Sequence, residues 1–402
     1  MKLLLFALLS QALLCASVFS QTTQTAQKST DSSQKIVSSL DTFIGKLYKH
    51  LDAAEPNKNL FFSSYSIVVA FYLLSLGAKS NTHQQIFEGL SLDTSVIAEE
   101  DIKKGFQDLL QDTNQHSTSI QLNTTNACFI DEKLKPLKKF LDDLKLFESE
   151  VISTDFEKTE EAKDKINKYV EEKTNGLIKE LLDSLDSDTK LALVNIIYFK
   201  GTWKDIFNKN HTHEEDFHVD EKTVVKVPMM SRDGVYPVAF LPKIGCTVVE
   251  VPYKGNVSAI FIIPDEGKLK DVEKAFQEGS LKTWMKELKP MRISLSIPKF
   301  TTSVTVDLTE VLPELGIKDA FSDNADLSGI TGSRNFKVSK ATHKAVVSVD
   351  EEGTEAAAVT AIGISVLSLP PQVKANVPFL MSIVDKNTNV HLFTGRIKNP
   401  KE

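Results

Sequence analysis

Three histidines and two glutamates come closest to a metal site by residue type and spacing: His211, His213, His218, Glu214 and Glu215. Imidazole and carboxylate are zinc ligands, and spacings of two and five could bring two imidazoles together. The stretch is polar and lies beside a glycosylation sequon, which favours a solvated, charged loop over a metal site. The chain has no Gly-x-Ser-x-Gly turn, no His-Glu-x-x-His and no phosphate-binding glycine loop. We therefore expect no catalytic residue, no metal and no cofactor.

Residues 351–371, EEGTEAAAVTAIGISVLSLPP, form a long stretch without helix signals between two strand-like runs, Lys344–Val349 and Phe379–Ile383. A connection of this length inside a compact domain is uncommon, and it is usually functional or disordered. Its Ala, Val, Thr, Ile and Leu content argues against disorder, because disordered segments are polar, charged or rich in proline.

One face of this stretch is made entirely of small, uncharged side chains. At the period of two of a strand, this face carries Thr354, Ala356, Ala358 and Thr360. Such a face could enter a sheet between two strands without burying a charge. On this stretch alone, an ordinary exposed connection remains an equal alternative.

The elements that would position this stretch run from helices to strands. Apolar spacing predicts an amphipathic helix over Leu40–Leu51 and a fully buried helix over Ser66–Leu76. From Leu191 the pattern changes to strands, beginning with the continuous apolar run Leu191–Phe199. Helices first and strands later indicate an α+β fold. We find no linker, and we expect a single domain over residues 37–402.

The N-terminus and the composition predict a secreted, soluble protein. Residues 1–20 have one positive charge, a short apolar run and small residues at the end, which is typical of a signal peptide. We expect residues 21–36 to be a flexible tail. The formal net charge of −7 argues against nucleic-acid binding, and no further run is long enough to span a membrane. Three sequons predict surface glycans at Asn123, Asn210 and Asn256.

Six sequence blocks, taken in order, resemble one known family. They are Val194 to Trp203, Val227–Met230, Ile297–Phe300, Ala325–Ile330, Ser339–Ala345 and Leu392 to Pro400. The chain resembles the serpins of the antitrypsin and antichymotrypsin group from about Leu40 to Pro400. This resemblance implies about nine helices, three β-sheets and an exposed reactive-centre loop over residues 351–371.

The resemblance assigns roles within the loop. The hinge of inhibitory serpins matches Glu351, Gly353, Thr354 and the run Ala356, Ala357, Ala358. Counting seventeen residues from Glu351, as the family does, places the scissile bond between Leu367 and Ser368.

The resemblance also implies a gate where the central sheet opens. His343 is expected to meet Asn195, Ser63 and Ser66, while Trp203 and Glu351 lie at the top of the sheet. Once Cys15 leaves with the signal peptide, Cys128 and Cys246 remain; one disulfide is possible, but the resemblance implies two unpaired thiols. Two departures from the family pattern are Ser64 and Ile206, each standing where a proline is common.

The function implied is suicide inhibition of serine proteases by a monomer. Leu367 suits a hydrophobic primary pocket, which favours chymotrypsin, chymase or cathepsin G, with elastase-like enzymes second. The helix around Glu99–Gln111 carries only Lys103 and Lys104, which argues against heparin binding. The alternative is a non-inhibitory carrier of a small hydrophobic hormone, because fold alone does not decide function. Carriers tend to lose the small residues of the hinge, which favours the inhibitor here.

Overall fold

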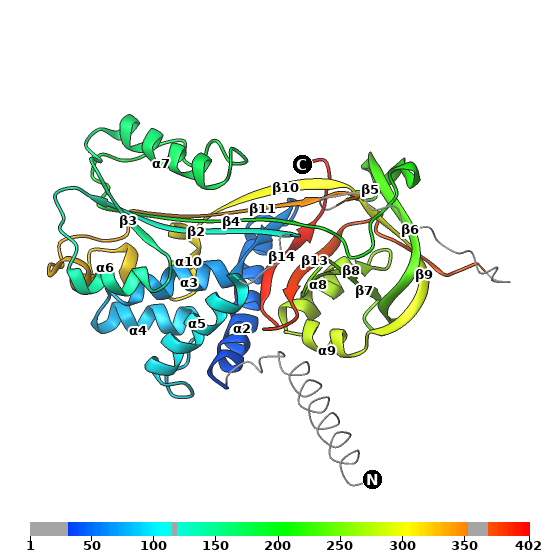
Figure 1. Ribbon diagram of the computed structural model, residues 1–402, viewed down its shortest axis with the longest axis horizontal. Coiled ribbons are helices and arrows are strands. Elements are labelled where there is room, and N and C mark those ends of the chain that lie inside the picture. The colour runs from blue at the N-terminus through cyan, green and yellow to red at the C-terminus, as the bar shows by residue number, and fades with distance from the viewer. Residues whose placement is uncertain (1–30, 115–118, 353–368) are drawn as a thin grey trace, which may run out of the picture.

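The computed structural model describes residues 31–114, 119–352 and 369–402 (Figure 1). The predicted hinge positions from Gly353 to Ala358 and the bond between Leu367 and Ser368 lie outside the described residues, as do residues 1–30. The described chain has ten α-helices: α2 (Asp31–Ala54), α3 (Ser64–Ser75), α4 (Ser80–Gly89), α5 (Glu99–Asn114), α6 (Lys138–Lys145), α7 (Thr159–Lys173), α8 (Leu269–Gln277), α9 (Leu281–Lys286), α10 (Leu308–Glu314) and α11 (Ser328–Thr331).

The described strands pair into two sheets. The five-stranded sheet has the order β10 (Phe300–Asp307), β11 (Lys340–Val349), β4 (Leu191–Gly201), β2 (Ile120–Asp131) and β3 (Glu150–Thr154). The nine-stranded sheet has the order β1 (Leu60–Phe62), β14 (His391–Ile397), β13 (Phe379–Asp385), β8 (Val257–Pro264), β7 (Cys246–Pro252), β6 (Val224–Leu241), β9 (Lys289–Pro298) and β12 (Gln372–Lys374), with β5 (Thr212–His218) beside β6.

The α+β class is confirmed, whereas the expected three sheets are two hydrogen-bonded sheets in the described chain. The reason is the length of β6, which has 18 residues. It pairs with β5 through its first part, with β9 through its middle and with β7 through its end. The resulting ladder is continuous where the resemblance implies two separate sheets.

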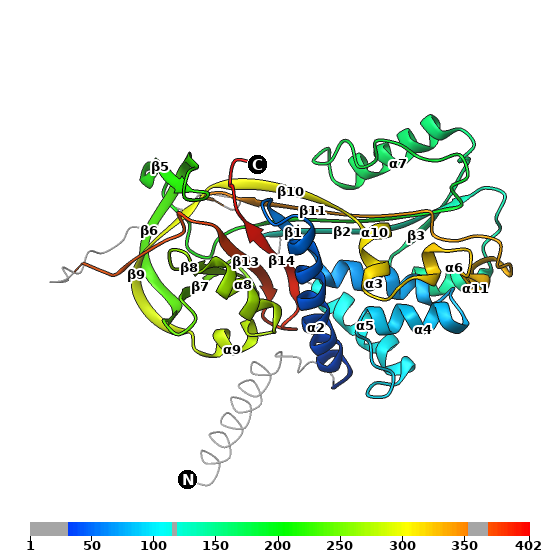
Figure 2. The ribbon, with the colours of Figure 1, turned by 180° about the vertical axis from the view of Figure 1, so that it is seen from behind.

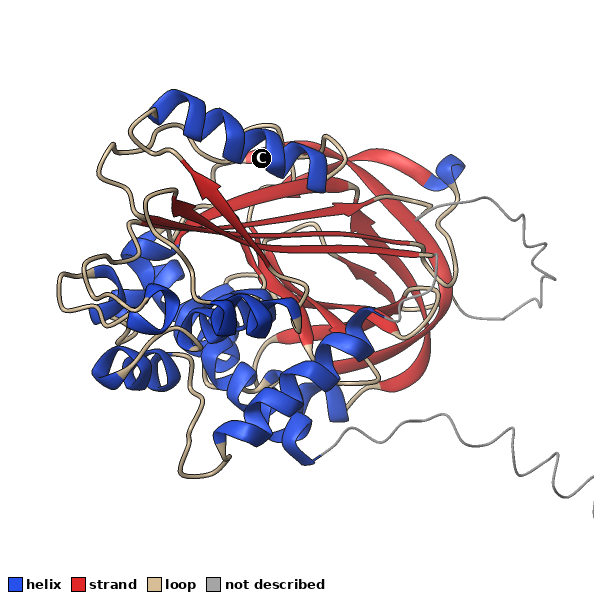
Figure 3. Cartoon of the chain, turned by 60° about the vertical axis from the view of Figure 1, so that its left-hand side comes forward, coloured by secondary structure: helices blue, strands red, loops and turns tan. Residues whose placement is uncertain are grey.

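Helices cover both faces of the five-stranded sheet (Figures 1 and 2). Beneath it lies the main core, which includes α3, a helix whose residues Ser64–Leu74 are buried except for Ala70. A helix that is apolar on all sides is stable only inside a core, which explains its position. On the other face, α7 lies across the strands (Figure 3) and closes a second, smaller apolar cluster.

That smaller cluster spans neighbouring strands. Val170 of α7 packs in it with Ile196 and Tyr198 of β4 and with Val346 of β11. The segment after α7 is tied to β11 as well, since Lys344 Nζ donates to the Glu180 carbonyl at 3.0 Å. The helix therefore bridges the line along which β4 and β11 meet.

The flexible tail expected over residues 21–36 is wrong at its C-terminal end. Helix α2 begins at Asp31, and Ser33 and Ile36 are buried. The Ile36 side chain approaches Gly105 of α5, so packing between helices orders a stretch whose polar composition hid it.

The serine at the start of α3 leads to a stability prediction. Ser64 is the first helical residue, Ser63 before it is extended (φ −112°, ψ 104°), and the Ser64 hydroxyl is buried without a hydrogen-bond partner in the described chain. Proline suits the first helical position, and an extended residue suits the position before it. We expect Ser64→Pro to raise the free energy of unfolding by about 1 kcal/mol, measured by urea denaturation. Ser64→Ala should give only the part due to the hydroxyl, and a Pro variant less stable than the parent would contradict the prediction.

Candidate functional site

The seam between β4 and β11 is the feature that an inserted strand would require. The two strands are parallel and directly paired over eight residues, from Lys340 opposite Ala192 to Val347 opposite Phe199. Most residues of both strands are buried. The two strands are hydrogen-bonded directly to each other. An antiparallel strand can therefore enter between them only after this pairing is broken.

A buried polar network holds this seam. His343 of β11 is opposite Asn195 of β4, and the His343 Nδ1 to Asn195 Oδ1 distance is 2.5 Å. The Ser63 backbone N–H donates to His343 Nε2 at 3.1 Å, and Asn195 Nδ2 donates to the Ser66 carbonyl at 3.1 Å. The Ser63 hydroxyl accepts from the Ser66 N–H at 3.1 Å. The four residues predicted to meet at the gate are therefore in contact.

The bonding pattern determines where the histidine proton lies. Since Nε2 of His343 accepts from a backbone N–H, Nδ1 carries the proton and donates to Asn195. Burial lowers the pKa of His343 to about 3, so the ring is neutral at physiological pH. The network joins the two strands through one neutral hydrogen bond, and separating the strands would leave both partners unpaired.

Sequence reasoning missed Asn126, the third polar residue of this row. Asn126 of β2 is opposite Asn195, and its Oδ1 accepts from Asn195 Nδ2 at 2.5 Å. The row thus crosses β11, β4 and β2 at one level of the sheet. A polar residue next to the apolar run Ala127–Ile130 was the available signal, but pairing with Asn195 depends on a register that sequence does not provide.

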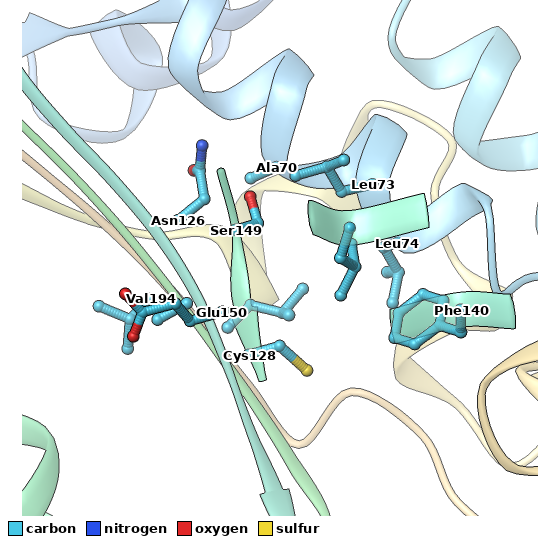
Figure 4. A pocket seen from close by; sticks show the side chains of 12 residues that line it. Ala70, Leu73, Leu74, Asn126, Cys128, Phe140, Ser149, Glu150 and Val194 are labelled. Atoms are coloured by element: carbon cyan, nitrogen blue, oxygen red, sulfur yellow. The ribbon is translucent and has the colours of Figure 1, made fainter. Parts of the chain in front are cut away.

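A small cavity lies beside this row, under β2 (Figure 4). It measures about 30 Å³ and is lined by Ala70 and Leu73 of α3, Asn126 and Cys128 of β2, and Phe140 of α6, among others. A space of this size is large enough to hold a water. The cavity is therefore a packing defect next to Asn126, at the level where the sheet would have to open.

The buried histidine makes stability dependent on pH. His343 is neutral in the folded chain but titrates near 6.5 once exposed, so the unfolded chain binds more protons between about pH 6.5 and 3. Stability therefore falls as the pH drops below 6.5. We expect the stability advantage of the parent over His343→Gln to shrink by about 2 kcal/mol between pH 7 and pH 5, measured by urea denaturation. Comparing the two chains cancels His391 and Asp41, whose pKa values also shift. A difference independent of pH would contradict the prediction.

The top of the seam is where β4 and β11 end. Trp203, just after β4, donates from Nε1 to the Asp350 carbonyl at 2.7 Å and stacks on Tyr253, with ring centroids 4.1 Å apart. Glu351, two residues past β11, is 4% exposed. The Phe207 N–H donates to the Glu351 carbonyl at 3.0 Å. The structure therefore places Trp203 and Glu351 together at this end, as expected.

Three consecutive acids at this end are each paired with a different lysine. Lys200 lies 3.3 Å from Asp350, Lys299 lies 2.7 Å from Glu351, and Lys209 pairs with Glu352. Thr212 also donates to Glu351, at 2.9 Å. Burial raises the pKa of Glu351, but the hydrogen bonds from Lys299 and Thr212 outweigh it, and the net pKa is below the ordinary value. The start of the loop is therefore anchored to three separate elements.

The comparison with known families assigns the fold. The family model described as "Serpin (serine protease inhibitor)" matches residues 38–400. The chain belongs to the serpin family. It is 48% identical to alpha-1-antiproteinase 2 of Equus caballus over 92% of this chain and 88% of that protein. It is 46% identical to alpha-1-antiproteinase of Bos taurus over 92% and 89%. The crystal structure of human thyroxine-binding globulin has a TM-score of 0.87 at 38% identity, covering 92% of this chain and 100% of that one.

The remaining predicted residues of this serpin lie apart from the seam. Asn210 and Asn256 are exposed, whereas Asn123 is half-buried in β2, opposite Tyr198. His213 and His218 are exposed on β5, and the described residues contain no group of three potential metal ligands. In the described part of the chain, no helix combines the length and apolarity needed to cross a membrane.

Cys128 and Cys246 of this serpin are buried free thiols, as the resemblance implies. Burial raises the pKa of Cys128 and of Cys246 to about 12. A thiol reacts as its thiolate, so neither is reactive at neutral pH.

Proposed function

We propose that this serpin is a secreted inhibitor of serine proteases rather than an enzyme, and that it acts as a suicide substrate. The protease attacks the Leu367–Ser368 bond and forms an acyl-enzyme. The released segment Gly353–Leu367 then enters the seam between β4 and β11 as a new strand. The observation that carries the proposal is the direct pairing of these two parallel strands, with the segment of small residues following β11.

The dimensions support trapping of the protease. At about 3.3 Å per residue, the segment Gly353–Leu367 spans roughly 50 Å when extended. Full insertion would carry the acyl-linked protease from one end of the sheet toward the other. Distortion of its active site would then stall hydrolysis of the acyl bond.

The polar network and the acid–lysine pairs would hold the sheet of the uncleaved chain closed, while the gain in strand pairing would favour the inserted form. Insertion breaks the His343–Asn195 hydrogen bond and eight residue pairs, but it replaces one strand interface by two. The intact protein would therefore be less stable than the cleaved, inserted form. Strained states that release energy on cleavage are a recognised switching device.

The target class is proposed from Leu367. A large apolar side chain fits the hydrophobic slot of chymotrypsin-like enzymes and not the acidic pocket of trypsin-like ones. Chymotrypsin, chymase and cathepsin G are the proposed partners, and elastase-like enzymes follow.

A carrier function is the second candidate, because human thyroxine-binding globulin, which was solved in complex with thyroxine, has a similar structure. The hinge distinguishes the two functions. The run Ala356–Ala358 keeps the small residues that an inserting strand needs. A thyroxine titration followed by intrinsic fluorescence tests the carrier function independently of inhibition.

The deciding experiment mixes the full secreted chain with chymotrypsin and separates the products by denaturing electrophoresis. We expect a covalent complex, and mass spectrometry should locate the new C-terminus at Leu367. The chain cut in the loop by a non-target protease should unfold at a markedly higher temperature than the intact chain. Cleaved serpin without a complex, or no gain in thermal resistance on cleavage, would overturn the proposal.

A further inference from the structure

The first half of β2 forms an open edge of the five-stranded sheet. β4 pairs with one side of β2 from Ile120 to Ile130, whereas β3 pairs with the other side only from Ala127 to Asp131. Within the described residues, no strand therefore pairs with the outer side of residues 120–126. An open edge presents backbone N–H and C=O groups onto which a strand of another molecule can add. We call residues 120–126 the β2 edge.

The residue types of the β2 edge give it no protection against strand addition. Proteins protect such edges with lysines, other charges, prolines or bulges. The stretch 120–130, IQLNTTNACFI, contains neither a charged residue nor a proline. Uncharged segments of high β-propensity and this length are prone to aggregate where they are exposed, and the side chains of Gln121 and Thr124 are exposed. The β2 edge therefore needs protection of another kind.

A groove of about 550 Å³ follows the β2 edge. Thr113 of α5 and Phe147 contribute to its lining, together with Glu172, Lys173 and Asn175 from the C-terminal end of α7. The last three side chains are polar and exposed, so they can form hydrogen bonds with a ligand that carries hydroxyl and amide groups. Such groups are those of N-acetylated sugars.

A glycosylation sequon lies in the middle of the β2 edge. Asn123, Thr124 and Thr125 form this sequon, and all three residues line the groove. Asn123 is opposite Tyr198, which belongs to the cluster under α7. Residues directly opposite each other on paired strands face the same side of a sheet, so Asn123 faces the side that carries α7. A glycan on Asn123 would therefore begin in the groove, between β2 and the end of α7.

We propose that an N-linked glycan on Asn123 occupies this groove and protects the β2 edge from pairing with a second copy of this chain. An N-glycan is bulky and hydrated, and its first sugars lie against the polar side chains at the end of α7. An added strand would have to lie about 4.8 Å from β2, in space that the glycan fills. This inference rests on the proposed secretion, because the sugar is attached in the secretory pathway, but it does not depend on which protease is the target.

The first part of the test establishes whether the sugar is present, using the full chain secreted by cultured mammalian cells. Thr125→Val keeps the shape of threonine and abolishes the sequon, whereas Thr125→Ser keeps the sequon and is the matched control. Mass spectrometry of the peptide that contains Asn123, before and after treatment with a peptide N-glycosidase, measures occupancy. We expect the parent and Thr125→Ser to carry the glycan and Thr125→Val to lack it. Asn123→Gln is a second variant without the sugar.

The second part follows self-association of the purified monomers by light scattering and size-exclusion chromatography. We expect Thr125→Val and Asn123→Gln to form oligomers at least about fivefold faster than the parent and Thr125→Ser. Adding Thr124→Lys to Thr125→Val should restore the parent rate, because a lysine protects an edge without any sugar. Asn256→Gln removes an exposed sequon outside the groove and should associate at the parent rate. Thermal unfolding of each variant establishes that it is folded.

A further variant separates edge pairing from entry of one copy's loop into the seam of another. Thr354→Arg, added to Thr125→Val, should leave the rate of association unchanged, and oligomers that disappear with it would overturn the proposal. An unmodified Asn123 in the parent, or a Thr125→Val chain that associates no faster than the parent, would overturn it as well. Fresh monomers of the single variants at positions 123, 125 and 256 should inhibit chymotrypsin with the parent stoichiometry. If neither they nor the parent inhibit it, the proposed inhibitory function falls, while the role of the glycan is still decided by the rates of association.

Discussion

We expect the Thr354→Arg variant to be cleaved by chymotrypsin without trapping it. A strand entering the seam would have core on both sides. Ile197 and Phe199 of β4 belong to the main core, while Ile196 and Tyr198 face the cluster under α7. An arginine at the leading end of the strand would bring an unpaired charge into this space, at a cost of several kcal/mol. Insertion should then be slower than hydrolysis of the acyl-enzyme.

The measurement is the ratio of covalent complex to cleaved serpin on a denaturing gel, together with the stoichiometry of inhibition. We expect the stoichiometry to rise at least tenfold for Thr354→Arg. Thr354→Val is the matched control, because it has the same shape and no charge, and it should trap as the parent does. A Thr354→Arg chain that still forms complex at the parent yield would show that the strand does not enter the sheet from this residue onward.

A second large effect is expected from Leu367→Arg, which should redirect inhibition from chymotrypsin to trypsin. The primary pocket of trypsin carries an acid that pairs with arginine, whereas that of chymotrypsin is an apolar slot. We expect the rate constant for chymotrypsin to fall by roughly a hundredfold or more and that for trypsin to rise by a similar factor. Inhibition kinetics with both enzymes at the same salt concentration provide the measurement.

The control for this variant is Leu369→Arg. Leu369 is 95% exposed and lies two residues further along the chain, so the same change there should leave the preference for chymotrypsin intact. If Leu369→Arg switches the preference and Leu367→Arg does not, the scissile bond has been assigned to the wrong position.

Much of the fold could be predicted because its signals are local. The run Leu191–Phe199 is apolar at nearly every position except Asn195, so a buried strand with one polar residue follows from sequence alone. The partners of Asn195 required the family resemblance, and the structure places His343, Ser63 and Ser66 around it.

The features that the sequence alone could not predict depend on which residues of distant strands lie opposite each other. Asn126 joins the polar row only because β2 pairs with β4 at that residue. The lysines that anchor residues 350–352 come from positions 200, 209 and 299, and no spacing rule connects these positions. The same limit explains the sheets, since the continuity of β6 past three partners depends on how an 18-residue strand bends.

The position of α7 has a consequence for timing. Val346 of β11 and Tyr198 of β4 pack under the same helix but on opposite sides of the seam, which would have to widen by about 4.8 Å to admit the proposed strand. In the proposed insertion, α7 would have to move away from the sheet before β4 and β11 could separate. Substitutions in this small cluster should therefore change the rate of strand insertion without altering the final inserted structure. The balance between trapping the protease and hydrolysing the acyl-enzyme could then be adjusted at a site that the protease never contacts.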